Sequence, residues 1–352
     1  MKHLMRKYDE TLYQSGLLDF YFKGLNMGIL DIETTGLNPS RNKFILGGLY
    51  NCGEKTMHQF LAESRKEEPA ALAAYLEELS KVDLVVTYNG KHFDMPFLEK
   101  RRAAFANTLA YASHADPTAA SAPAAESLSH DLAHAKLPYN LDLYLVVQGH
   151  SPIRKFVPNL KQKTVEDYMG LWQNREDEIS GAESVTLYNT YEKTKDPQLE
   201  HKILLHNSDD VLQLTRLLRV VSKCDFHKAM FHLGFPAGPL IVKNIRLDHK
   251  ELLVTGLQQG TSLDYRSFAW EDAPVETHFE SKTGSFTLRL PLLQDSGMRI
   301  ADLDALGMDE KDFRQYPTYS SGFLALETPD GKNYMEINHF IKAFIHIFMN
   351  SL

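Results

Sequence analysis

Two acidic side chains, Asp31 and Glu33, close a short apolar stretch of the chain. Residues two apart on a β-strand point to the same face, so a strand over residues 27–33 would aim both carboxylates at one place. Two like charges that close repel each other, and a divalent cation between them removes the repulsion. Residues 34–36 then end the strand and open a loop. Taken alone, the pair is also what two solvated acids at an exposed strand end would show.

A third carboxylate, Asp94, follows the next apolar run, residues 83–88. Asn89-Gly90 signals a turn after that run, and Asp94 falls where the next helix is expected to begin. A carboxylate at this position is an ordinary N-terminal helix cap. Capping requires neither the turn signal nor the neighbouring aromatic Phe93, so a second role for Asp94 stays open.

A fourth carboxylate, Asp210, lies on a long helix predicted over residues 197–221. His206 precedes it by four residues and therefore shares its face of the helix. This face borders the apolar stripe, at the edge of the buried side. The neighbouring Asp209 points about a quarter-turn away and is the weaker candidate. A solvated His–Asp pair of little energetic weight is the competing interpretation.

The three segments occur in the order of the exonuclease motifs of the DEDD superfamily, which has the ribonuclease H-like fold. Residues 31–37, DIETTGL, resemble the first motif, and residues 89–96, NGKHFDMP, resemble the second as found in proofreading domains of family B DNA polymerases. His206 and Asp210 stand where the third motif has a Tyr and an Asp. The chain also resembles bacterial YprB-type ribonuclease H-like proteins, through residues 140–144, 160–166 and 177–181.

The resemblance implies a site for two divalent cations about 4 Å apart, held by four carboxylates: Asp31, Glu33, Asp94 and Asp210. Ligands that are all oxygen favour Mg²⁺ or Mn²⁺ over zinc. In such a site one cation presents water as hydroxide, and both stabilise the charge that develops as a phosphodiester bond breaks. The expected activity is that of a metal-dependent 3′–5′ exonuclease.

The water-orienting residue implied by the resemblance is His206. The family has either a Tyr with three intervening residues or a His with four, whereas this chain has a His with three. The departure concerns the orientation of the ring toward the water rather than the metal ligands.

The resemblance also implies contacts with the 3′ end of single-stranded DNA or RNA, and the sequence does not separate these two partners. The candidate substrate-binding residues are Thr34, Thr35, Leu37, Asn89 and Phe93. Lys161 and Lys163 are candidate phosphate contacts, although each is equally a candidate for a solvated surface charge.

The elements that must position these residues alternate between strands and helices. Residues 27–33, 43–50 and 55–61 read as three antiparallel strands, followed by a helix over 67–81 and a strand over 83–88. A helix from Asp94, a strand near 140–145 and helices over 160–171 and 197–221 complete the pattern. The sequence therefore predicts an α/β fold, a ribonuclease H-like mixed sheet flanked by helices, with a smaller β-rich C-terminal region.

We expect an N-terminal extension over residues 1–25, an exonuclease domain over 26–225 and a β-rich domain over 240–352. Within the second of these, residues 103–136 are rich in Ala, Ser and His and read as a flexible insertion or a loosely helical excursion. His130 and His134 have helical zinc-ligand spacing there, but no third ligand has convincing spacing. Hairpin signals at 279–290 and 323–337 and a final helix from Asn338 describe the C-terminal domain.

Composition sets broad limits on function. The 352 residues carry a net charge of −8, so the surface as a whole does not attract nucleic acid, although a local basic groove still can. Two widely spaced cysteines argue against a disulfide framework or a thiolate metal site. No signal peptide or membrane-spanning stretch is evident, which predicts a cytoplasmic protein with no membrane partner.

The alternative to an exonuclease is a non-catalytic nucleic-acid-binding or assembly protein that keeps the ribonuclease H-like fold. Loss of an acid from the first two motifs would favour that alternative, and here both motifs keep theirs. The apolar final helix is the feature that an assembly role would use, although burial within its own chain is the simpler expectation.

Overall fold

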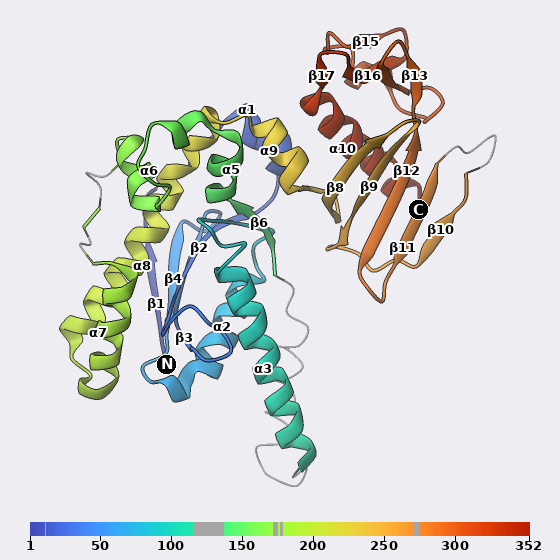
Figure 1. The fold of residues 1–352 in the computed structure, drawn as a ribbon. Coiled ribbons are helices and arrows are strands. Elements are labelled where there is room, and N and C mark those ends of the chain that lie inside the picture. Colours follow the sequence, from blue (N-terminus) through green and yellow to red (C-terminus); the bar gives the residue numbers. More distant parts are fainter. Residues whose placement is uncertain (11, 116–136, 172–174, 177–178, 270–274) are drawn as a thin grey trace. The chain divides into compact units, whose positions relative to one another are not determined.

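The computed structural model describes residues 1–10, 12–115, 137–171, 175–176, 179–269 and 275–352, with the backbone alone for residues 107–115. The chain divides into two compact units (Figure 1). The first unit comprises Met1–Ser15 and Gly24–Cys224, and the second comprises Gly16–Lys23 and Asp225–Leu352.

The described part of the first unit is built on a six-stranded sheet in the order β1-β4-β3-β2-β5-β6. Its strands are β1 (Lys2–Lys7), β2 (Met27–Thr34), β3 (Phe44–Asn51), β4 (Thr56–Leu61), β5 (Leu84–Thr87) and β6 (Tyr139–Asp142). The central strand β2 is antiparallel to β3 and parallel to β5, which is in turn parallel to β6. The predicted mixed sheet and its antiparallel start are confirmed.

Helices flank this sheet (Figure 1). They are α2 (Glu68–Leu79), α3 (Asp94–Ala115), α5 (Leu143–His150), α6 (Gln162–Tyr168), α7 (Gly181–Thr194) and α8 (Pro197–Leu217), with short 3-10 turns η1 (Arg65–Glu67), η2 (Pro152–Lys155) and η4 (Leu218–Lys223). In one core cluster, Leu30 and Ile32 of β2 pack with Leu72 and Tyr75 of α2. Because side chains alternate along a strand, the acids of β2 point to the other face, where α8 packs.

Two element boundaries differ from those predicted. Helix α3 continues through Ala115, so the first part of the expected insertion, residues 103–115, is helical. Alanine has the highest helix propensity, and here it outweighs the lack of apolar periodicity. The remainder, residues 116–136 with His130 and His134, lies outside the described residues. The strand predicted near 140–145 ends at Asp142, whose side chain caps α5.

Residues 1–25, which the sequence analysis treats as an extension, supply elements to both units. Strand β1 pairs with β4 along its whole length. Helix α1 (Gly16–Phe22) belongs to the second unit.

The second unit is rich in β-structure, as predicted. One sheet has the order β10-β11-β12-β9-β8-β7, and a smaller one contains β13 to β17. The strands are β7 (Phe235–Ala237), β8 (Leu240–Asp248), β9 (Glu251–Gln258), β10 (Tyr265–Ser267), β11 (Glu276–Glu280), β12 (Ser285–Pro291), β13 (Leu293–Asp295), β14 (Met298–Asp302), β15 (Tyr319–Ser320), β16 (Phe323–Thr328) and β17 (Gly331–Lys332). Helices α9 (Phe226–Leu233) and α10 (Tyr334–Ser351) and the turn η5 (Glu310–Asp312) complete it. Within the described ranges, none of the helices has the length and apolar character needed to cross a bilayer.

The packing of α2 on β3 requires a glycine at position 47. A Cβ atom added at Gly47 would lie 2.6 Å from Cδ2 of Tyr75. The Tyr75 ring cannot easily move away, because it is fully buried and its hydroxyl donates a hydrogen bond to the Gly48 carbonyl at 3.2 Å. We expect Gly47→Ala to lower the free energy of unfolding by about 1–3 kcal/mol in urea denaturation. Gly149→Ala is the control, because nothing lies within 4 Å of that position on α5. A neutral Gly47→Ala variant would contradict this packing.

Candidate active site

Strand β2 and the start of α3 bring the first three predicted acids together. The Ile32 N–H, which lies between Asp31 and Glu33, donates to Oδ1 of Asp94 at 3.2 Å. Asp94 is the first residue of α3 and is only 4% exposed. Its carboxylate is therefore fixed against the backbone of the strand that carries the other two acids.

The turn before α3 is held by Asp142, which sits at the end of the neighbouring strand β6. One carboxylate oxygen of Asp142 accepts the Asn89 N–H at 2.8 Å and the other accepts the Lys91 N–H at 3.0 Å. Asn89 has a positive φ of 66°, a conformation that Asn tolerates better than most residues. A Cβ at Gly90 would lie 2.3 Å from Oγ1 of Thr87, so glycine is required for the close approach there. Asp142 thus positions the second motif.

Helix α8 carries the two remaining predicted catalytic residues, His206 and Asp210, and packs on β2. Nε2 of His206 lies 3.5 Å from Oε1 of Glu33 and 3.7 Å from Oδ2 of Asp210. These three side chains have ligand atoms within 4.8 Å of one another, a separation compatible with one shared cation. The first and third motifs therefore meet in space, as the sequence predicts.

Asn207, which the sequence analysis does not single out, fixes Asp31. Its Nδ2 donates to Oδ2 of Asp31 at 3.1 Å and to the Asp31 carbonyl at 3.2 Å, while its Oδ1 accepts from Nε2 of Gln59 at 3.0 Å. The amide reaches the strand over Gly48, which pairs directly with Asp31. A Cβ at Gly48 would lie 2.3 Å from Oδ1 of Asn207, so only glycine leaves room.

The electrostatics show how closely the four acids converge. Burial raises the pKa of Asp31 well above its usual value, and the charges of Asp210, Asp94 and Glu33 raise it further. Burial likewise raises the pKa of Asp94 to about 7, against the opposing effect of hydrogen bonds from backbone N–H groups. Such a surplus of buried negative charge, with oxygen donors from three segments, is chemically suited to divalent cations.

Arg175 is a site residue that sequence reasoning misses. Its Nη2 lies 2.5 Å from Oδ1 of Asp210, and its Nε and Nη2 donate to the two oxygens of Glu166 at 3.0 Å each. The guanidinium is 1% exposed. Nothing in the sequence around Arg175 signals its partners.

A cavity of about 890 Å³ opens over this centre. All but two of the predicted site residues line it: Asp31, Glu33, Thr34, Thr35, Leu37, Phe93, His206 and Asp210. Asp94 is buried, and Asn89 lies in the turn held by Asp142. The Leu37 side chain is 81% exposed, so an apolar surface is presented at the cavity. Lys161 and Lys163 also line the cavity.

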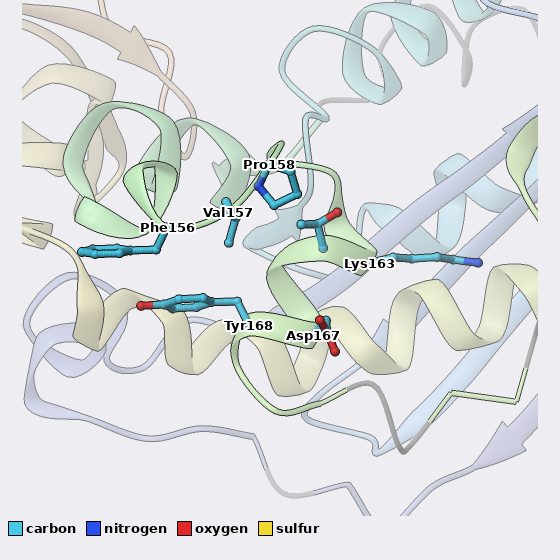
Figure 2. Close-up of a pocket in the computed structure, with 7 residues that line it drawn as sticks. Phe156, Val157, Pro158, Lys163, Asp167 and Tyr168 are labelled. Atoms are coloured by element: carbon cyan, nitrogen blue, oxygen red, sulfur yellow. The ribbon is translucent and has the colours of Figure 1, made fainter.

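A second hollow, of about 610 Å³, shares Lys163 with this cavity. Figure 2 shows the rings of Phe156 and Tyr168 at one side of it and Lys163 extending from the other side. Both rings are unusually open, with exposed fractions of 67% for Phe156 and 46% for Tyr168. Exposed aromatic rings offer surfaces on which the bases of a single strand can stack.

A family model described as the RNase_H superfamily matches residues 29–222, which include all four acids, His206 and both hollows. This chain belongs to the RNase_H superfamily. The match covers more than half of the chain and confirms the predicted ribonuclease H-like fold. It supports nuclease chemistry in general terms, and the acidic residues are a set that can hold metal.

Solved structures similar to this RNase_H superfamily chain include DNA-processing enzymes. The family B DNA polymerase of the archaeon Pyrobaculum calidifontis is 19% identical, with a TM-score of 0.37 over 56% of this chain and 24% of the polymerase. A structure of exonuclease I is 13% identical, with a TM-score of 0.32 over 66% of this chain and 55% of that one. E. coli exonuclease I in complex with a dT13 oligonucleotide is 13% identical, with a TM-score of 0.33 over 92% and 74%.

This chain spans about a quarter of the polymerase and about half of the first exonuclease I structure. Scores this low do not establish a shared function. A search of curated protein sequences found no match.

The raised pKa of Asp94 predicts how pH affects the metal-free protein. As pH rises from about 4 to about 7, the unfolded chain releases this proton while the folded chain keeps it, so stability falls across that window. Asp94→Asn keeps an oxygen for the Ile32 N–H but removes the charge. We expect it to raise the free energy of unfolding at pH 8 by roughly 1–3 kcal/mol in chelator, and to flatten the slope between pH 4 and 7. Asp167→Asn, at an exposed position, is the control.

Denaturation curves at several pH values check this expectation. A loss of stability in Asp94→Asn at pH 8 would contradict it.

Proposed function

We propose that this chain is a metal-dependent 3′–5′ exonuclease that hydrolyses phosphodiester bonds at single-stranded DNA or RNA ends. The observation that carries the proposal is the convergence of Asp31, Glu33, Asp94 and Asp210, from three distant segments, beside one cavity. Sites of this kind are built for phosphoryl transfer, because the chemistry needs charge neutralisation more than a protein nucleophile.

The four carboxylates would hold two divalent cations, Mg²⁺ or Mn²⁺, since all the ligands are oxygens. The raised pKa of Asp31 supports this fit, because its causes are burial and then the charges of the other three acids. When bound, such cations lower the pKa of a water and stabilise the charge on the reacting phosphate. The hydrogen bonds from Asn207 and Ile32 keep the acids in place for this role.

His206 is suited to orient the attacking water and accept its proton. Its Nε2 points between Glu33 and Asp210, so one ring nitrogen already faces the two acids at which the water would be activated. The three-residue spacing therefore still delivers the imidazole to the centre.

The terminal nucleotide would occupy the cavity beside the acids. Thr34 and Thr35 line it through the loop after β2, while Leu37 and Phe93 offer apolar surface to the base. Asn89, at the turn, is proposed to contact the nucleotide from the start of α3. The next nucleotides would extend past Lys163 into the hollow of Phe156 and Tyr168 (Figure 2).

The ion pair between Arg175 and Asp210 favours a second candidate function. Its guanidinium already neutralises one oxygen of Asp210, so this acid has a partner even before any metal binds. A non-catalytic nucleic-acid-binding protein would retain such an ion pair in place of a cation. The two candidates differ in turnover, which the following experiment measures.

The activity assay uses single-stranded DNA and RNA labelled at either end, with Mg²⁺ or Mn²⁺. The proposal expects stepwise shortening from the 3′ end, and Asp31→Ala should slow it at least about a hundredfold, because a metal ligand is lost. Glu99→Ala, an exposed acid on α3, should leave the rate unchanged.

Binding of the same strands without metal-dependent shortening would favour the non-catalytic candidate. Equal rates in Asp31→Ala and the wild type would exclude the proposed centre.

The aromatic hollow can be tested apart from the chemistry. Phe156→Ala combined with Tyr168→Ala should weaken binding of a single-stranded oligonucleotide about tenfold, because stacking on an aromatic side chain contributes about 1–3 kcal/mol per base. Fluorescence anisotropy measures the affinity. A rise in KM with little change in kcat would show that the hollow contributes to binding of the strand and not to the chemical step.

Phe268→Ala is the matched control, because Phe268 is 58% exposed but lies in the second unit. An unchanged affinity in the double variant would remove the hollow from the strand's path.

A further inference from the structure

Glu54, His58 and Glu78 form a second group of ligand-type side chains, here named the β4–α2 cluster. Glu54 lies in the turn before β4, His58 on β4 and Glu78 in the last turn of α2. His58 shares its strand face with Phe60, which packs in the core beneath α2. The cluster therefore lies on the α2 side of the sheet, whereas the acids of β2 face α8, and its interpretation does not depend on the proposed exonuclease.

The separations within the cluster are those of ligands around one ion. Nε2 of His58 lies 3.5 Å from Oε2 of Glu54 and 3.7 Å from Oε1 of Glu78, and the ligand atoms all lie within 4.8 Å of one another. Ligand atoms around a tetrahedral Zn²⁺, each about 2.1 Å from the ion, are about 3.4 Å apart. A direct N–H···O hydrogen bond would be shorter, at about 2.9 Å. The observed distances therefore favour a shared cation over direct contact.

Two of these atoms are buried and have no hydrogen-bond partner among the described residues: Nε2 of His58 and Oε1 of Glu78. The two side chains are 3% and 6% exposed. A buried polar atom without a partner is unfavourable, and native proteins rarely leave two of them facing each other. The side chain of Glu54 is 52% exposed, which gives an ion a route of entry.

The ring of His58 is held in the orientation that a metal ligand needs. Its Nδ1 lies 3.3 Å from Nε2 of His3, whose ring stacks on Phe60 with centroids 4.1 Å apart. With Nδ1 turned toward His3, Nε2 is the ring nitrogen that faces Glu54 and Glu78.

The charges of the cluster also leave room for a cation. Lys81 binds Oε2 of Glu78 at 2.7 Å, which leaves Oε1 to face His58. The two carboxylates and the one ammonium group together have a net charge of about −1. A divalent ion would reverse this surplus and satisfy both unpartnered atoms at once.

We propose that the β4–α2 cluster binds one transition-metal ion, with Zn²⁺ as the best fit. One imidazole nitrogen and two carboxylates suit Zn²⁺, whereas Mg²⁺ prefers oxygen ligands alone. Water completes the coordination at the exposed side, next to Glu54. The ion would cross-link the β3–β4 turn to the end of α2, a structural role on the other face of the sheet from the proposed cleavage chemistry.

The test measures zinc bound by the full chain after equilibrium dialysis in excess Mg²⁺, which competes for oxygen-only sites. We expect one Zn²⁺ per chain in a His206→Gln background, which removes the nitrogen ligand of the other group of metal-ligand side chains. Glu54→Gln should weaken zinc affinity at least about tenfold. His58→Gln should abolish binding, and Glu77→Gln, on the exposed face of α2, is the matched control.

Two further readouts separate metal binding from folding. Co²⁺ in place of Zn²⁺ should give the visible absorption of a nitrogen- and oxygen-ligated ion, and Glu54→Gln should reduce it. Saturating Zn²⁺ should raise Tm by about 5 °C in the wild type and less in Glu54→Gln. Because Glu54 is exposed, its variant folds without rearranging the core, whichever way His58→Gln behaves.

The proposal is overturned if the wild type takes up no Zn²⁺ in excess Mg²⁺, or if Glu54→Gln and Glu77→Gln bind it equally well. Either result would leave the cluster as contacts among the three side chains without an ion. Neither result bears on the exonuclease proposal, which the strand-shortening assay decides.

Discussion

The arrangement of the first unit depends on the electrostatic repulsion among four acidic side chains. Asp31, Glu33, Asp94 and Asp210 are forced into one small, poorly solvated region, and burial together with mutual charge raises the pKa of Asp31. Such an arrangement opposes folding unless the surrounding structure holds it together. The sheet and two helices hold the acids together, because each of these elements supplies one or two of the acids to the same site.

The groups that restrain these acids are mostly neutral. Asn207 crosses the space over Gly48 to reach Asp31, and Gln59 fixes the amide of Asn207 from behind. On the other side, Asp142 holds the turn that delivers the start of α3. Neutral donors position a carboxylate without cancelling its charge, so the negative potential that attracts a cation is preserved.

Local spacing explains which site residues the sequence could predict. Asp31 and Glu33 follow from the two-residue repeat of a strand, and His206 with Asp210 follows from the helical repeat. Arg175 and His58 could not be found this way, because Asp210 and Glu78, which they meet, lie on other elements and share no local spacing with them. Composition left the extent of α3 open between an insertion and a loose helix, and the structure continues the helix through Ala115.

The ion pair between Arg175 and Asp210 has a consequence for the order of events after synthesis. Glu166 also accepts two hydrogen bonds from this guanidinium, which hold it beside Asp210. The chain thus reaches its native arrangement with one acid already neutralised by its own side chain. For the proposed cations, binding at Asp210 would then be a competition with a tethered guanidinium, and its outcome would vary with the concentration of free metal around the protein.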